Sequence, residues 1–334
     1  MTQLKTIFGL DTVIPFVYPA REVQYNSINP SQIMGVELEI EHAATFAVVD
    51  GMHTTDDGSL REDGVEFITA PMNYQSMMSC LSDFFKGNHP TDDCYSERTS
   101  IHVHMNVQDF SLEQLANLTL LYQTCEYLLY DFIGHDRDKN IFCVPLNECM
   151  VSRNAATSFI NGDYSPVHRW LKYTGMNLAP IRTIGTVEFR HMHGNADLAF
   201  ISQWLRILIQ LLHTAQKMEY AQLFEIIVKL NSSSAYEQLL HMIFGDETKA
   251  IITPDYKTKL SYGVLAAKYL VIRPASPKAP NPLRGVIPNN IVPLRGVIPN
   301  NIVPDGDVRL RPFGAANVNW GNQLWVEVDD LQQR

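Results

Sequence analysis

Two glutamates lie one residue apart inside an apolar run, in the sequence Gly-Val-Glu-Leu-Glu at 35–39. The run has strand character, and alternate side chains of a strand point to the same face, so Glu37 and Glu39 are expected to lie side by side. Two carboxylates about 7 Å apart on one face repel each other, and they lose water if that face is buried. A divalent ion such as Mg²⁺ or Mn²⁺ would stabilise the pair, because these ions prefer oxygen ligands. The alternative is a strand whose polar face is solvated, which gives the same alternation.

Four more segments carry residues that could bind a metal ion or a phosphate. They are Asp-Asp-Gly-Ser-Leu at 56–60, with Asp57; Gly-Val-Glu-Phe-Ile-Thr-Ala-Pro at 64–71, with Glu66; Ser-Ile-His-Val-His-Met-Asn at 100–106, with His102 and His104; and Gly-Thr-Val-Glu-Phe-Arg-His at 185–191, with Glu188 and Arg190. Each also has a structural explanation: a turn, an edge-strand charge, a solvated or hydrogen-bonded histidine face, and a surface ion pair. The recurrence of such groups in four separate apolar strands favours one interior site in a curved antiparallel sheet.

Short strands and longer helices must position these residues. Apolar runs bounded by polar residues or Gly predict strands at 33–49, 64–69, 100–107 and 184–192. Apolar residues at helical spacing predict helices at 74–86, 111–133 and 197–218, with a further helical region at 219–245. Ser111 and Gln114 have the spacing of a capping box at the start of the second helix. Residues 134–183 are expected to be loop-rich, which is common where a loop covers a binding site, and residues 260–272 are ambiguous.

The chain divides into an irregular N-terminal segment at 1–30, a main domain at 31–272 and a Pro-rich tail at 273–334. Within the tail, the sequence at 282–292 recurs unchanged at 293–303. Its prolines exclude a helix and disfavour a central strand, and two copies are too few for a solenoid. We interpret the repeat as a tandem duplication in an extended tail, whose end at 323–330 is compatible with a strand.

Composition excludes several functional classes. The 334 residues carry a net charge of −10, which argues against tight binding to duplex nucleic acid. The five cysteines are irregularly spaced and odd in number, as is typical of a reducing cytosol. The N-terminus lacks a secretion pattern, and no uncharged apolar stretch reaches the roughly 18 residues of a membrane span. The sequence therefore predicts a cytoplasmic protein with no membrane partner.

Taken in order, the five motifs resemble the amidoligase family. These are phage and bacterial carboxylate–amine ligases of the glutamine synthetase and glutamate–cysteine ligase superfamily. The resemblance covers residues 33–212 and extends to further family positions at Tyr173, Asn177, Asp197 and Trp204. Residues 220–334 match none of its motifs.

The resemblance implies an α+β fold, in which a curved antiparallel sheet forms a glutamine synthetase-like half-barrel with helices packed on the outside. It implies that residues 31–272 are a catalytic domain that uses ATP and Mg²⁺ or Mn²⁺. Such an enzyme transfers the γ-phosphoryl group to a carboxylate, and an amine then displaces phosphate from the acyl phosphate. The two substrates would be small molecules or peptides, and the compartment would be the cytoplasm, or the host cytoplasm for a phage protein.

The resemblance also assigns roles to single residues. The metal ligands would be Glu37, Glu39, Glu66 and Glu188, with Asp57 beside them and one of His102 and His104. Spacing does not choose between the two histidines; we favour His104, which could instead contact the nucleotide phosphates. Arg190 would hold the transferring γ-phosphoryl group, so Glu37, Glu188 and Arg190 would form the catalytic set. Arg137 is either a clamp for a substrate carboxylate or phosphate, or a plain surface arginine.

Two other hypotheses remain open. The first is a metal-dependent hydrolase that uses His102, His104 and the carboxylates without ATP. A His-x-His pair favours Zn²⁺ whereas a Glu-dominated site favours Mg²⁺, so the excess of Glu argues for the ligase. The second is a non-catalytic phage protein that keeps the fold as a binding module.

Overall fold

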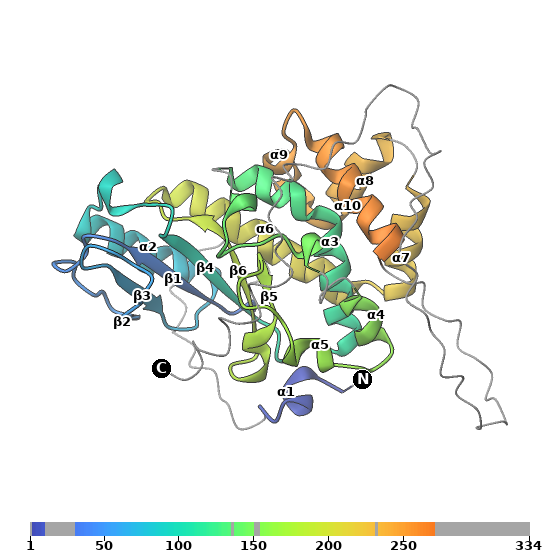
Figure 1. Ribbon diagram of the computed structural model, residues 1–334, viewed down its shortest axis with the longest axis horizontal. Coiled ribbons are helices and arrows are strands. Elements are labelled where there is room, and N and C mark those ends of the chain that lie inside the picture. The colour runs from blue at the N-terminus through green and yellow to red at the C-terminus, as the bar shows by residue number, and fades with distance from the viewer. Residues whose placement is uncertain (1, 11–30, 135–136, 150–153, 231–232, 271–334) are drawn as a thin grey trace, which may run out of the picture. The chain divides into compact units, whose positions relative to one another are not determined.

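The computed structural model of the protein describes residues 2–10, 31–134, 137–149, 154–230 and 233–270. Its architecture is mixed α+β, with one antiparallel sheet of six strands and helices packed against it (Figure 1). The strands are β1 (Met34–Ile40), β2 (Met52–Thr55), β3 (Val65–Thr69), β4 (Ser100–Asn106), β5 (Met176–Asn177) and β6 (Thr186–His193). Their order in the sheet is β2-β3-β1-β4-β6-β5, so β1, β4 and β6 are neighbours.

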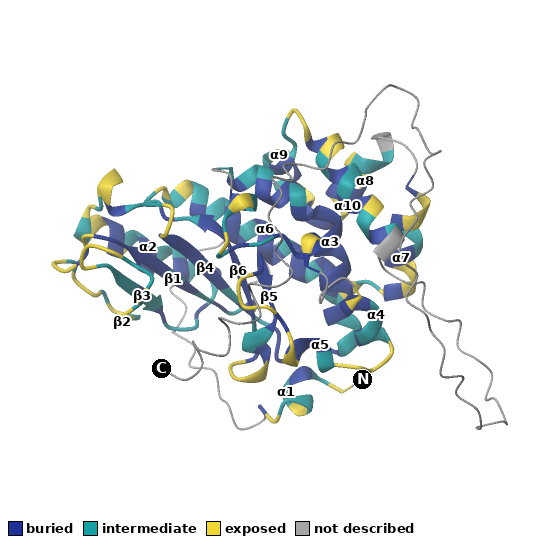
Figure 2. Ribbon diagram, viewed as in Figure 1, coloured by how far each residue is buried: buried dark blue, intermediate teal, exposed yellow. Residues whose placement is uncertain are grey.

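Alternation along the strands explains the two faces of the sheet. Val36 and Leu38 of β1, Val103 of β4 and Phe189 of β6 are each at most 1% exposed and belong to the hydrophobic core. The charged residues of the same strands alternate with these apolar residues and therefore point to the opposite face. Figure 2 shows that burial is concentrated in these strands and in the helices that pack on them.

The helices account for most of the remaining described residues. They are α1 (Leu4–Ile7), α2 (Tyr74–Asn88), α3 (Leu112–Ile133), α4 (Ala155–Ile160), α5 (Ser165–His168), α6 (Leu198–Lys217), α7 (Tyr220–Lys229), α8 (Ser233–Phe244), α9 (Thr248–Ile251) and α10 (Tyr256–Leu270). Short 3₁₀ turns lie at Asp92–Cys94, Arg137–Lys139, Leu146–Glu148, Ala179–Arg182 and Gly245–Glu247. α2 packs on β1, and α3 packs on β6 and on the five helices α4, α6, α7, α9 and α10.

The two long central helices form where the sequence predicts them. Ser111 accepts the Gln114 backbone N–H at 3.2 Å, and the Gln114 side chain accepts the Ser111 N–H at 2.9 Å, which confirms the capping box of α3. α6 begins after Asp197, whose carboxylate accepts the backbone N–H groups of Ala199 and Phe200. Among the described helices, α6 is the one whose length and composition would allow it to cross a membrane, and 56% of its apolar window is buried in this structure.

The sequence misplaces some elements. The predicted strand at 33–49 ends at Ile40, because the backbone turns at His42, which has a φ of 55°. The short strands β2 and β5 are not predicted from the sequence, and α4 and α5 lie in a region expected to be loop-rich. The sheet is antiparallel as expected, but it is neither closed nor strongly curled, so the expected half-barrel is not seen. Its edge strands are short, with four residues in β2 and two in β5.

The N-terminal segment is not wholly irregular, since α1 docks on the main domain. Leu4 is fully buried, and its backbone N–H donates to the carbonyl of Phe110 at 2.7 Å. Residues 11–30, the duplicated segment at 282–303 and the sequence at 323–330 lie outside the described residues.

Candidate metal centre

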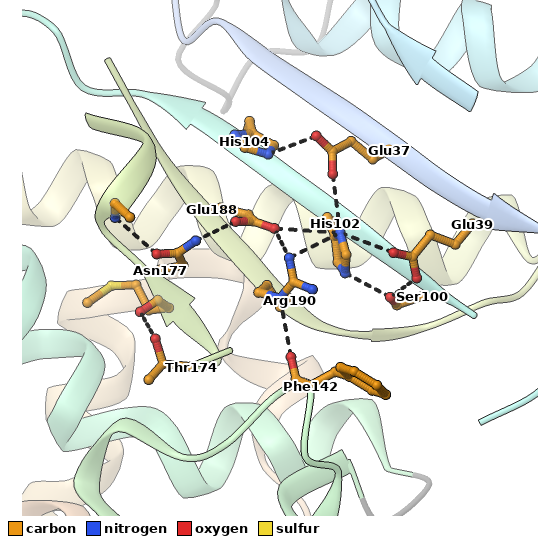
Figure 3. A network of polar contacts seen from close by, with 12 residues as sticks. Glu37, Glu39, Ser100, His102, His104, Phe142, Thr174, Asn177, Glu188 and Arg190 are labelled. Atoms are coloured by element: carbon orange, nitrogen blue, oxygen red, sulfur yellow. Dashed lines mark hydrogen bonds and ion pairs between the residues drawn. The ribbon is translucent and has the colours of Figure 1, made fainter. Parts of the chain in front are cut away.

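Polar residues from four strands converge on one face of the sheet (Figure 3). The register pairs six of the predicted site residues: Glu39 with Glu66, Glu37 with His102, and His104 with Glu188. Because all six come from β1, β3, β4 and β6, the strand positions inferred from alternation do meet at one place. Their faces are fixed by the apolar residues between them, which are buried in the core.

His102 lies at the centre of this cluster and is 3% exposed. Its Nδ1 atom lies 3.2 Å from Glu37 Oε2, 3.7 Å from Glu39 Oε1 and 3.5 Å from Glu188 Oε1. Its Nε2 atom lies 2.8 Å from the Ser100 hydroxyl, which donates a hydrogen bond to Glu39. Three carboxylates thus surround one ring nitrogen of a buried side chain.

Glu188 and Arg190 of β6 form a buried ion pair, in which Arg190 Nη1 donates to Glu188 Oε1. The other Glu188 oxygen accepts a 2.7 Å hydrogen bond from Asn177 Nδ2 on β5. Arg190 Nε donates to the backbone carbonyl of Phe142 at 3.2 Å, and its guanidinium carbon lies 5.7 Å from the ring centroid of Tyr173. The guanidinium is therefore held by a carboxylate, a loop carbonyl and an aromatic ring.

The remaining carboxylates of the cluster have partners of their own. His104 Nε2 lies 3.0 Å from Glu37 Oε1, and its Nδ1 lies 2.9 Å from the Thr186 hydroxyl. The Thr55 hydroxyl donates to Glu66 Oε2 at 2.8 Å. Glu37 is thus bound through both oxygens to the two histidines, since Oε2 faces His102.

The local electrostatics differ between the carboxylates. Burial acts to raise the pKa of Glu37, but hydrogen bonds from the two histidines outweigh it and hold this pKa well below its ordinary value. Burial also opposes ionisation of Glu188, yet the charges of His102 and Arg190 keep its pKa below the ordinary value. For Glu66, burial and the negative charge of Glu37 raise the pKa to about 7. The cluster thus holds one carboxylate whose ionisation is opposed by burial and by the neighbouring negative charge of Glu37.

Two sets of three ligand atoms lie within 4.8 Å of one another: Glu37, His102 and Glu188, and Glu39, Glu66 and His102. His102 belongs to both sets, whereas His104 belongs to neither of these sets found among the described residues. Both sets contain two carboxylates and one imidazole. This donor chemistry fits a divalent ion, and the majority of oxygen ligands fits Mg²⁺ or Mn²⁺.

A small cavity of about 70 Å³ adjoins the cluster. Its lining includes carboxylates, Glu39 and Asp57, and the cationic groups of Arg98, Lys172 and Arg190. Asp57 Oδ1 accepts the backbone N–H of Ser59 at 2.7 Å, as expected of a turn residue. Asp57 therefore lies at the cavity, and its role as a metal ligand stays a prediction.

Arg137 is 5% exposed, so it is not a plain surface arginine. Its Nε donates to the carbonyl of His191 at 2.8 Å and its Nη2 to the carbonyl of Arg190 at 3.1 Å. Its side chain also lines the small cavity. Its role as a clamp for a substrate stays a prediction, whereas its contacts to the backbone are a finding that spacing alone does not reveal.

Several residues that hold the cluster are not predicted from the sequence as site residues. Ser100 has the same two-residue spacing as the histidines after it, so the alternation could have identified it. Thr186 precedes Glu188 by two residues in the same way. Phe142 contacts Arg190 through its backbone carbonyl, and because every residue has such a carbonyl, the residue type does not indicate this role. Of the other family positions, Asn177 bonds Glu188, Tyr173 lies beside Arg190, Asp197 caps α6 and Trp204 is fully buried.

Comparison with known proteins gives a match to a protein family and no match to a curated protein. Residues 48–212 match the model of a family described as "Putative amidoligase enzyme". The matched region runs from the connection before β2 into α6, so it includes Glu66, His102 and Glu188 but begins after Glu37 and Glu39.

Proposed function

Because residues 48–212 of the chain belong to the amidoligase family, we propose that the protein is an ATP- and Mg²⁺-dependent carboxylate–amine ligase. It would form an amide or isopeptide bond through an acyl-phosphate intermediate. The observation that carries this proposal is the convergence of four glutamates from three strands, β1, β3 and β6, around His102 and beside the buried Arg190. Amide formation by this route needs cations near the phosphoryl group and no protein nucleophile.

The ligand sets fit one or two divalent ions. Glu37, Glu188 and His102 would hold one ion. Glu39 and Glu66 would hold another, together with the same His102 imidazole. A bound Mg²⁺ or Mn²⁺ supplies positive charge to the phosphoryl oxygens. The geometry favours His102 over His104 as a ligand, because His104 bridges Glu37 and Thr186 and so orients a ligand carboxylate.

Arg190 is the residue proposed to hold the transferring phosphoryl group. The ion pair with Glu188 holds its guanidinium group in place, and the planar shape of this group suits two-pronged binding of phosphate oxygens. The cavity beside it also presents Arg98 and Lys172, which could contact further phosphate oxygens. The cluster and the cavity beside it thus provide both carboxylates for cations and cationic side chains for an anion.

The proposed reaction balances without another reactant. A carboxylate oxygen attacks the γ-phosphorus of ATP, the bond to the β-phosphate oxygen breaks, and ADP leaves. The amine nitrogen then attacks the acyl carbon and loses a proton, and the carbon–oxygen bond to phosphate breaks. The products are the amide, ADP and phosphate. The substrates we propose are small molecules or peptides that carry the carboxylate and the amine.

The test is to incubate the protein with ATP, Mg²⁺ and mixtures of amino acids, peptides and polyamines. We expect ADP and phosphate to form in equal amounts only when both a carboxylate and an amine are supplied. Glu37→Gln, which removes one negative charge and keeps the side-chain shape, should lose this activity. Cleavage of a substrate without ATP would favour the hydrolase, and binding without turnover would favour the binding module.

A further inference from the structure

The pairing of β4 with β6 is irregular at the candidate site. A register shift between Ile101 and Val103 of β4 places two residues of β6, Arg190 and His191, opposite the single residue His102. This arrangement is a β-bulge on β6. Bulges redirect a side chain and interrupt the hydrogen bonds of the ladder, and they are enriched next to active sites.

The two residues of the bulge lie on opposite faces of the sheet. The Arg190 side chain lies in the charged cluster, where it pairs with Glu188. The His191 side chain is fully buried on the side of the helices, where its Nε2 lies 2.8 Å from the hydroxyl of Tyr122. The next residue, Met192, is also fully buried. The alternation of β6 therefore continues through Arg190 and His191 and is interrupted between His191 and Met192, one residue after Arg190 faces the cluster.

One side chain holds both carbonyl groups of the bulge. Arg137 Nε donates to the carbonyl of His191 at 2.8 Å, and Arg137 Nη2 donates to the carbonyl of Arg190 at 3.1 Å. Arg137 is 5% exposed, so these hydrogen bonds are protected from water. A guanidinium group suits this task because its donors form a rigid fork.

We propose that Arg137 is a positioning residue that fixes the β6 bulge and thereby aims Arg190 at the phosphoryl group. The inference rests on the proposed ligase function for its catalytic part. Two of the three guanidinium nitrogens of Arg137 bind the backbone of the bulge, so it acts through Arg190. The other anchors of Arg190 complete the support: its N–H donates to the Gly175 carbonyl at 2.9 Å, and its Nε to the Phe142 carbonyl.

The experiment compares Arg137→Met and Arg137→Lys with a matched control. Asn117 is also fully buried and also donates to two backbone carbonyls, those of Ala215 at 3.0 Å and Met218 at 2.6 Å, on the C-terminal side of α6. Asn117→Ala thus removes the same kind of support elsewhere. We expect Arg137→Met to lower turnover on the order of a hundredfold, with the KM for ATP and the affinity for Mn²⁺ within a few-fold of wild type. Arg137→Lys, which keeps a donor, should recover part of the turnover, and Asn117→Ala should keep wild-type turnover per folded molecule.

A second measurement does not depend on activity. The exchange of backbone amide hydrogens in 186–193 should be faster in the Arg137 variants than in wild type and in Asn117→Ala, because only they loosen the bulge. If Arg137→Met does not fold, Arg137→Lys carries both measurements. A raised KM with unchanged turnover would assign Arg137 to substrate binding, and losses no larger than those of Asn117→Ala would make it merely structural; either result overturns the proposal. If wild type has no ligase turnover, the proposed function fails, while unchanged exchange in 186–193 would separately overturn the role of Arg137.

Discussion

Glu39 and Glu66 lie directly opposite each other on the antiparallel strands β1 and β3, so the register of the sheet brings two carboxylates together. Like charges in opposed positions of a sheet are destabilising. The raised pKa of Glu66, about 7, has burial as its main cause and the negative charges of Glu37 and Glu39 as further causes. At this position the fold is therefore less stable than it would be without two opposed carboxylates.

Glu66→Gln should stabilise the metal-free protein and weaken metal binding. The substitution removes repulsion worth up to about 1 kcal/mol, and it also removes a ligand oxygen. Unfolding with EDTA at pH 8 and titration with Mn²⁺ measure the two effects. Glu237→Gln, which changes an exposed carboxylate of α8, is the control and should alter neither quantity. Lower metal-free stability together with unchanged Mn²⁺ affinity would show that Glu66 has a structural role.

Glu188→Ala should destabilise the protein much more than Glu37→Ala. Glu188 is the partner of Arg190, and both are at most 6% exposed, so the substitution leaves a buried positive charge without its ion pair. Loss of one partner of a buried pair costs about 3–5 kcal/mol. Glu37 is bound by two histidines, and a histidine, unlike an arginine, does not carry a permanent charge. Urea unfolding measures the difference, and the double variant Glu188→Ala/Arg190→Met should recover much of the loss. Equal destabilisation by the two single variants would contradict this account.

Arg190→Lys should lower turnover about a hundredfold or more while leaving most of the ATP affinity. A Lys ammonium cannot reproduce the planar fork that contacts Glu188 and the Phe142 carbonyl and is proposed to bind phosphate as well. Steady-state kinetics with varied ATP separate the two effects. Arg206→Lys is the control, since Arg206 pairs with Glu247 away from the cluster. Wild-type turnover in Arg190→Lys would exclude the phosphoryl-binding role.

Glu126 should make the stability of the protein depend on pH. It lies fully buried on α3 and accepts the backbone N–H groups of Leu146 and Asn147, and burial raises its pKa from 4.5 to about 8. The folded protein therefore binds more protons than the unfolded chain between these values, so stability falls as pH rises through this window. The slope from one group is at most about 1.4 kcal/mol per pH unit. Urea unfolding from pH 5 to 9 should show a shallower slope in Glu126→Gln. Identical slopes in the two proteins would contradict the prediction.

The sequence predicts the face of the site because alternation is local. Glu37, His102 and Glu188 each lie in a short apolar run, where spacing alone decides which residues share a face. Neighbouring strands can be recognised in the same way, but their order and register depend on contacts between distant segments. The strand β5 has two residues and no pattern of its own, so Asn177 is found through the family resemblance and not through periodicity.

The support of the cluster could not be predicted for a different reason. The groups that hold Arg190 and the bulge include backbone carbonyls, and every residue has one, so no residue type marks them. Arg137 illustrates the difficulty, because its sequence neighbours suit an exposed loop whereas its side chain is buried against β6. The two histidines show the same limit, since their spacing is symmetric and only the partners of each ring distinguish them.

β6 serves two environments at once. Glu188 and Arg190 belong to the charged cluster, while Phe189 and His191 between and after them are fully buried among the helices. One inserted or deleted residue between Thr186 and Glu188 would exchange these sets, placing a phenyl ring among the carboxylates and a carboxylate in the apolar interior. Among relatives of this chain, we therefore expect changes of length to accumulate in the connections on either side of this strand, and its eight positions to be inherited without gaps.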